Sequence, residues 1–278
     1  MPKLHHKNMQ RTIRIWAMKT LQATVELIEH ATIAAVSPQQ VHTLPGWLLP
    51  MDDGTVGRAK SAVPLSHDAA NADASQVQTI EQLYSQQGLQ ACFRLPEVPS
   101  FDAMRLALLA KGYRPEQPTL VQVGTVATMR QVTQQSPAQV DDAPDVHWAA
   151  VFLGEGFDPV DGASRVKTLA KAPGSVFASV RSDEGPALAA GAGAFSHGWG
   201  SVHGMRTGAA QRGQGLAGRV LAGLAIAAQQ RAIEKIFLQV EQSNTSAQAL
   251  YRRAGFATAW AYVYWRLPPT AGTGTDGC

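Results

Sequence analysis

The chain has 278 residues, of which 45% are hydrophobic and 16% charged, and its formal net charge is +3. This length allows two domains of roughly 100–150 residues each, and so small a charge gives no support to a nucleic-acid partner. Two distant cysteines, Cys92 and Cys278, form no ligand cluster, and without an apolar run of about 18 residues or a cleavage signal we expect a soluble, cytoplasmic protein that binds no metal and no membrane.

The first half of the sequence alternates helices and strands. Apolar residues at helical spacing predict a first helix over Thr20 to Ala35. Apolar runs at 46–50 and 59–65 flank Asp52-Asp53-Gly54 and indicate a hairpin. The elements expected next are a helix that Gly88 closes, a strand at 91–95, a helix at 101–111 and a strand at 119–128.

Residues 129–144 are predicted to be a linker, because they are rich in glutamine and contain two prolines and little to bury. We place a domain boundary near Asp141. The predicted organisation is a first domain at 1–140, a second domain at 141–270 and a disordered tail at 271–278.

The second half has its own series of expected elements. They are a helix at 163–170, strands at 176–180, 187–194 and 199–207, a long helix at 215–231, a strand at 235–240, a helix at 246–254 and a strand at 259–267. The order of helix, strand, helix and Gly-aromatic at 83–113 recurs at the end of the second half, which suggests an internal repeat.

The residues between the strand that ends at Thr207 and the long helix form a glycine-rich turn, Arg212-Gly213-Gln214-Gly215-Leu216-Ala217. Free backbone N–H groups at a helix N-terminus bind anions. The two glycines allow close approach of a phosphate, and Arg212 and Arg219 add positive charge. The turn therefore predicts a diphosphate site, although a tight turn with a packing glycine would show the same sequence.

Two blocks of the second half resemble the GNAT superfamily of N-acetyltransferases. Arg212, Gly215 and Ala217 match its cofactor motif in register. The run 238–244, with Ala247, Leu250-Tyr251 and Gly255-Phe256, is similar to its second block of strand, asparagine, helix and Gly-Phe. The resemblance covers about residues 146–267. It implies acetyl-CoA as cosubstrate and direct transfer of the acetyl group, in a ternary complex, to a primary amine of a small molecule or peptide.

The first half resembles the N-terminal half of tandem GNAT proteins at 58–65 and 83–112, but no Arg-x-x-Gly-x-Gly pattern occurs between Ser66 and Ile80. We therefore expect a degenerate, non-catalytic copy that forms one wall of an acceptor pocket. The fold class that the resemblance implies is α/β (α+β), with two GNAT-like domains, each a mixed, mostly antiparallel sheet flanked by helices.

The resemblance also implies a set of cofactor-binding residues: Met205, Arg206, Thr207, Arg212, Gly213, Gln214, Gly215, Leu216, Ala217, Asn244 and Tyr251. Asn244 would bind the pantetheine arm, or cap the helix that follows it. Tyr251 would protonate the departing thiolate, whereas a core tyrosine would only pack its helix.

The general base is less clear from the sequence. Ribosomal-protein alanine acetyltransferases, which share the second block, have a glutamate where this chain has Gln239. Glu241 lies on the same side of an extended strand, and His203 on the preceding strand is another candidate. Solvent could also remove the proton.

Two alternatives to amine acetylation remain open. The same fold could bind acetyl-CoA as a non-catalytic sensor or regulatory module, and the cradle would also accept a different acyl group or an oxygen acceptor. The sequence does not distinguish a monomer from a homodimer.

Overall fold

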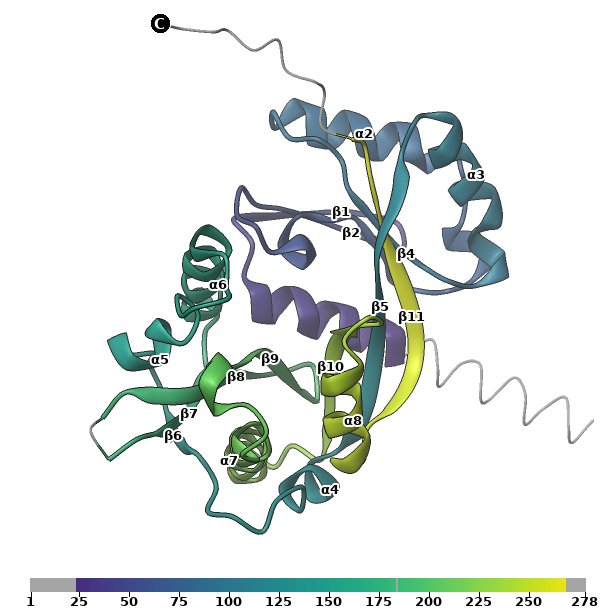
Figure 1. The fold of residues 1–278 in the computed structure, drawn as a ribbon. Coiled ribbons are helices and arrows are strands. Elements are labelled where there is room, and N and C mark those ends of the chain that lie inside the picture. Colours follow the sequence, from purple (N-terminus) through teal and green to yellow (C-terminus); the bar gives the residue numbers. More distant parts are fainter. Residues whose placement is uncertain (1–23, 184, 269–278) are drawn as a thin grey trace, which may run out of the picture.

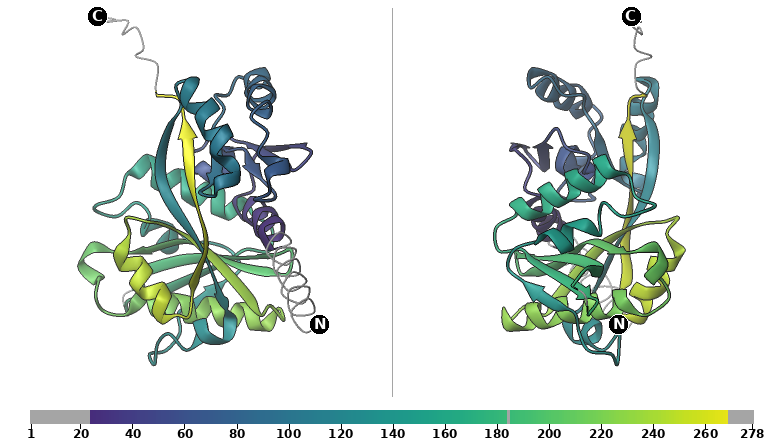
Figure 2. Two further views of the ribbon diagram at one scale, coloured as in Figure 1. Left: turned by 90° about the vertical axis from the view of Figure 1, so that its right-hand side faces the viewer. Right: turned by 60° about the vertical axis from the view of Figure 1, so that its left-hand side comes forward.

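The computed structural model of the protein describes residues 24–183 and 185–268. Its strands form an eight-stranded sheet and a three-stranded sheet, with helices packed around them (Figures 1 and 2). Residues 24–36 are helical, whereas the start of the first predicted helix and the predicted tail at 271–278 lie outside the described residues. Within these described ranges, no helix is both long and apolar enough to span a bilayer.

The larger sheet has the strand order β4-β11-β5-β10-β9-β8-β7-β6. The bounds of its strands are β4 Phe93–Pro96, β5 Arg114–Thr125, β6 Gln139–Asp141, β7 Val176–Arg181, β8 Ala187–Ser196, β9 Trp199–Thr207, β10 Lys235–Glu241 and β11 Ala257–Arg266. Neighbouring strands are antiparallel except β9 and β10, which run parallel. The predicted mixed, mostly antiparallel sheet flanked by helices is confirmed.

Strand β5, from the first half of the sequence, lies between two strands of the second half. It pairs with β10 through Val121 and Gln239 and with β11 through Leu120 and Ala261, and Figure 1 shows β5 and β11 side by side along their length. Strands from before and after residue 140 therefore belong to one continuous sheet. The division into domains 1–140 and 141–270 stays a prediction.

Side-chain alternation along β7 explains how helices cover both faces of the larger sheet. Val176, Ala178 and Val180 pack in the same cluster as the apolar residues of α7 (Leu216–Gln230). Phe177, which points to the opposite face, packs with Trp148 and Phe152. The remaining helices around this sheet are α4 Val126–Arg130, α5 Val146–Ala150, α6 Pro159–Lys171 and α8 Thr245–Arg253.

The smaller sheet confirms that the two apolar runs around Asp52-Asp53-Gly54 pair antiparallel, but it has no tight turn between them. Its strands are β1 Gln40–Leu44, β2 Trp47–Met51 and β3 Val63–Pro64, and its neighbouring helices are α2 Gln76–Gln86 and α3 Asp102–Ala110. The tight turn joins β1 and β2 at Gly46, which has φ +78°. The Asp52 carboxylate instead accepts hydrogen bonds from the backbone N–H groups of Gln39 and Gly54. β2 does pair antiparallel with β3, through a longer connection.

The predicted linker at 129–144 is wrong in its middle part, because this segment packs against α7. The N–H of Ala138 donates to the Arg219 carbonyl oxygen at 2.9 Å, and Arg219 Nε donates to the Ser136 carbonyl oxygen at 2.6 Å. Residues 139–141 then join the sheet as β6. Met129, Val132, Ala138 and Val140 of this segment also pack in or against the apolar cluster that contains the residues of α7.

Candidate active site

The glycine-rich turn between β9 and α7 presents unpaired backbone donors. Gly213 has φ +80° and Gly215 has φ +79°, a left-handed conformation that glycine adopts without strain. The hydrogen-bond ladder of α7 begins with bonds from Gly218 and Arg219 to the Gly215 carbonyl oxygen. The N–H groups of Leu216 and Ala217 precede that ladder and lie at the positive end of the helix dipole, which is a site suited to a phosphate anion.

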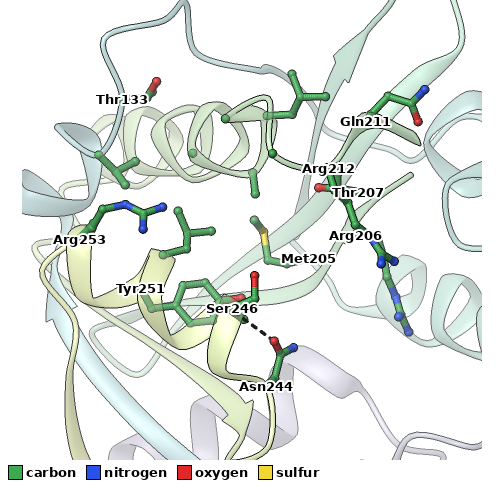
Figure 3. A pocket seen from close by; sticks show the side chains of 18 of the residues that line it. Thr133, Met205, Arg206, Thr207, Gln211, Arg212, Asn244, Ser246, Tyr251 and Arg253 are labelled. Carbon is green, nitrogen blue, oxygen red and sulfur yellow. Dashed lines mark hydrogen bonds between the residues drawn. The ribbon is translucent and has the colours of Figure 1, made fainter. Parts of the chain in front are cut away.

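A first cavity of about 590 Å³ lies at this turn. It is lined by nearly all of the predicted cofactor residues, namely Met205, Arg206, Thr207, Arg212, Gly213, Gly215, Leu216, Ala217, Asn244 and Tyr251. Gln214 is not among the lining residues, and its carbonyl oxygen accepts a hydrogen bond from Gln135. Figure 3 shows Tyr251 and Asn244 on one side of Met205, with Arg206, Thr207 and Arg212 on the other.

Some lining residues could not be found from the sequence motifs. Val132 and Thr133 come from the segment expected to be a linker, and Phe157 precedes α6. The side chain of Arg219, expected to face the phosphate, instead donates a hydrogen bond to the Ser136 carbonyl oxygen. The cavity therefore depends on parts of the chain that carry no cofactor motif.

Strands β9 and β10 separate beside this cavity. They pair from Gly200 and Ile236 as far as Val202 and Leu238, whereas β9 continues to Thr207 and β10 to Glu241. The register between β8 and β9 also shifts here, at Gly204 with φ +58°, which is the pattern of a β-bulge. The two parallel strands thus leave an opening between them.

A second cavity of about 370 Å³ adjoins the first at this opening. Met205, Arg206, Asn244 and Tyr251 line both cavities. The first half of the chain contributes the run 55–58, Gln117 and Thr119 to the second cavity. A group held in the first cavity would therefore meet one held in the second beside Tyr251.

Tyr251 has the properties required of a proton donor. It lies on α8, is 7% exposed, and burial raises the pKa of its hydroxyl to about 12. It therefore carries its proton at neutral pH and can donate it to a thiolate. Asn244 performs the capping role that the sequence allowed, because its Oδ1 accepts a hydrogen bond from Ala247 N at 3.0 Å.

The two candidate bases have very different surroundings. His203 is 4% exposed. Burial, with the nearby charge of Arg58, lowers its pKa to about 3. A histidine with so low a pKa is a weak base. Glu241 is exposed at the second cavity and accepts a hydrogen bond from the side chain of Gln117, so Glu241 is better placed to accept a proton.

Gln239, which the sequence resemblance compares with a glutamate of ribosomal-protein alanine acetyltransferases, forms hydrogen bonds with three neighbours. Its Oε1 accepts hydrogen bonds from Arg58 Nη1 at 3.2 Å and from the Tyr262 hydroxyl at 2.9 Å. Its Nε2 donates to Thr32 Oγ1 at 3.1 Å. Gln239 therefore connects β10 to Arg58 and Thr32 of the first half of the chain by hydrogen bonds, and it lines the second cavity without adding charge to it.

A metal has no evident place at this site. Among residues 24–183 and 185–268, no group of three or more His, Cys, Asp or Glu side chains is arranged to hold an ion. The cavities are instead lined by arginines, tyrosines, amides and backbone groups.

Comparisons with known proteins agree with this arrangement. The family described as "Probable histone acetyltransferase Rv0428c C-terminal" matches residues 22–265. No curated protein is significantly similar in sequence. A GCN5-related N-acetyltransferase from Kribbella flavida has a similar structure, with TM-score 0.64 and 16% identity over 88% of this chain and 95% of that one.

Two further solved structures share the fold. A tandem GNAT protein from the clavulanic acid biosynthesis pathway superposes with TM-score 0.54 at 12% identity, over 89% of this chain and 94% of that one. A GCN5-related N-acetyltransferase from Sphaerobacter thermophilus gives TM-score 0.52 at 20% identity, over 74% and 71%. At these identities the similarity shows the fold.

Proposed function

The chain belongs to the family described as "Probable histone acetyltransferase Rv0428c C-terminal", in the GNAT superfamily of acetyltransferases, and from this premise we propose that it transfers an acetyl group from acetyl-CoA directly to a primary amine. The observation that carries the proposal is the meeting of two cavities beside Tyr251, one at an anion-binding helix N-terminus and one lined by polar side chains.

The residues of the first cavity fit the pyrophosphate of the cosubstrate. The free N–H groups of Leu216 and Ala217 and the side chain of Arg212 supply donors and positive charge. Gly215 has φ +79°, a left-handed conformation that lets the chain turn tightly into α7 with the N–H groups of its first turn free. Bound here, acetyl-CoA would supply the acetyl thioester, and its pantetheine arm would follow the opening between β9 and β10.

The residues around the opening account for the protons of the reaction. A neutral amine attacks the acetyl carbon, so the N–C bond forms and the C–S bond breaks. The amine loses a proton to Glu241 or to solvent. The Tyr251 hydroxyl gives a proton to the departing sulfur, and the phenolate that remains is reprotonated from water. Backbone N–H groups near the register shift at Gly204 would stabilise the developing charge on the carbonyl oxygen in this proposal.

A variant pair at Ala217 tests the cofactor site. Ala217 lies in the first turn of α7 with ordinary helical geometry, so Ala217→Glu and Ala217→Gln introduce similar volumes and differ in charge. The glutamate would repel a pyrophosphate. Calorimetric titration with acetyl-CoA should show at least about tenfold weaker binding for Ala217→Glu than for Ala217→Gln, or about 1.4 kcal/mol.

Tyr251→Phe separates catalysis from binding. We expect acetyl-CoA binding within about threefold of the parent and a kcat lowered by roughly 10²- to 10⁴-fold. If the parent does not bind acetyl-CoA, the proposal is wrong. Binding without turnover on any amine would instead indicate the non-catalytic sensor that the sequence left open.

A further inference from the structure

We infer that the second cavity selects amines that also carry a carboxylate group, and that Arg58 binds that carboxylate. This inference rests on the proposed acetyl transfer and identifies its substrate class. It differs from the substrate suggested by the family's description, because a basic histone-like segment would bring positive charge to a site that already carries it.

The charges around the second cavity are unequal. Its lining includes Arg58, Arg165, Arg206 and Arg266, with Glu241 as its one carboxylate. Carboxylates just outside the lining pair with three of the arginines, and two of these arginines share the same carboxylate, Asp161. Arg165 and Arg206 lie 2.6 Å and 3.6 Å from Asp161 Oδ2, and Arg266 Nη1 lies 2.9 Å from Glu116.

Arg58 differs from the other three arginines because it has no ion-pair partner among the described residues. Among the described residues no carboxylate lies within 4.0 Å of it, and its hydrogen-bond partner is the neutral amide of Gln239. Its Nε is buried and has no hydrogen-bond partner in the described part of the chain. Glu29 lies near enough to feel the charge of Arg58 but is itself paired with Arg94 at 2.7 Å. A guanidinium held this way is ready to bind an incoming carboxylate.

Gln239 keeps this charge available. Its amide oxygen faces Arg58 and Tyr262, and its amide nitrogen is fixed by Thr32. A glutamate at the same position would place a carboxylate on the guanidinium and neutralise it from within the protein. The glutamine binds the guanidinium by a hydrogen bond without adding negative charge.

The geometry fits an amino-acid-sized molecule. Gln239 and Glu241 lie two residues apart on β10, so their side chains leave the same side of the strand about 7 Å apart. A carboxylate at Arg58 would therefore place an amine near Glu241 and Tyr251. Tyr264 also lines the cavity, and its hydroxyl lies 3.5 Å from the hydroxyl of Tyr262, which donates to Gln239.

Matched amines that differ only in the carboxylate provide the test. Phenylalanine is compared with phenethylamine, and lysine with cadaverine, by following release of free CoA thiol from saturating acetyl-CoA. We expect kcat/KM to favour the carboxylate-bearing member of each pair by at least about tenfold, as for a charge-assisted hydrogen bond.

Two variants assign the preference to Arg58. Arg58→Gln removes the charge, and Gln239→Glu keeps the arginine but gives it an internal counter-charge. Each should lower the ratio of kcat/KM for the carboxylate-bearing amine to kcat/KM for its carboxylate-free partner by about tenfold or more in both pairs. Arg130→Gln removes one positive charge from an exposed residue outside both cavities and should alter neither class.

The outcomes separate this inference from the proposed function. Acetylation of the carboxylate-free amines at equal or higher kcat/KM would overturn the inference and leave the acetyltransferase in place. Equal losses on both classes in Arg58→Gln and Gln239→Glu would also overturn it, because Arg58 would then have a general structural role. Preferential acetylation of a lysine-rich peptide would overturn it in favour of a basic acceptor. If no amine is acetylated, both proposals fail.

Discussion

Removing Glu29 or Arg94 singly should destabilise the protein far more than its surface ion pairs suggest. Glu29 Oε2 lies 2.7 Å from Arg94 Nη2, and the two side chains are 2% and 0% exposed. The guanidinium also lies over the ring of Tyr262, 5.0 Å from its centroid. The pair joins the helical residues 24–36 to β4 and supports the tyrosine that binds Gln239, so its loss should also reach the second cavity.

The expected magnitude follows from the burial of both partners. In Glu29→Met the charge of Arg94 would remain buried without a partner, and breaking a buried pair from one side costs about 3–5 kcal/mol. For a chain of this size 1 kcal/mol corresponds to about 2–4 °C, so the melting temperature should fall by about 6–20 °C. Replacing both residues by methionine removes the unpaired charge. The double variant should therefore lose at least about 2 kcal/mol less than the sum of the single losses.

Urea unfolding of the four proteins in this cycle, followed by tryptophan fluorescence, measures these differences. Lys111→Met is the control, because Lys111 pairs with Glu81 at the same 2.7 Å distance but with side chains 43% and 25% exposed. That surface pair should be worth no more than about 1 kcal/mol. A loss below about 1 kcal/mol in Glu29→Met, or additive losses in the double variant, would refute the reasoning from burial.

Three further changes test other parts of the structure. The pKa of His203 is about 6.5 in the unfolded chain and about 3 in the folded protein, so the free energy of unfolding of the parent should fall as the pH drops below about 6.5. His203→Gln should reduce that fall. An unchanged pH dependence of unfolding would contradict the lowered pKa of His203. Gly191→Ala would place a Cβ 2.7 Å from Met205 Sδ and 2.8 Å from Val220 Cγ1. It should lower the free energy of unfolding in urea by about 1–3 kcal/mol. An unchanged free energy of unfolding would show that both side chains can move away from the added methyl group. Asp145→Ala should lower the stability by about 0.5–2 kcal/mol, because it removes the side chain that caps α5. Asp145→Asn should lower it less, because asparagine can also cap a helix. Equal losses for the two variants in thermal unfolding would mean that the cap contributes nothing.

The geometry of the glycine-rich turn before α7 was predictable because it is local. A strand, a turn with two glycines and a helix follow one another within the run 199–230, so the sequence contains every residue that sets the direction of the free N–H groups. The glycines at 213 and 215 have the positive φ that such a turn requires. A second local run of sequence contains Asn244 and Tyr251. Asn244 precedes the N-terminus of α8, and Tyr251 lies in its last turn.

The polar segment at 129–144 shows where composition misleads. A flexible linker and a segment bound through its backbone both have few apolar side chains. This segment meets α7 through the N–H of Ala138 and the carbonyl oxygen of Ser136. It also packs Met129, Val132, Ala138 and Val140 against the apolar cluster of α7, so a few scattered apolar residues anchor a segment whose composition is that of a linker.

Gln239 shows most clearly how the site depends on distant parts of the chain. Its departure from a glutamate is visible in the sequence, but the meaning of that departure depends on Arg58, which is 181 positions away, and on Thr32, which is 207 positions away. The strand that carries Gln239 is in turn paired with β5 from the first half. A fragment beginning at residue 141 would keep the cradle and Tyr251, but it would lose the strand beside β10 and the arginine that faces Gln239. The first half of the chain thus contributes lining residues to the second cavity, and under the proposed function acceptor recognition would need both halves.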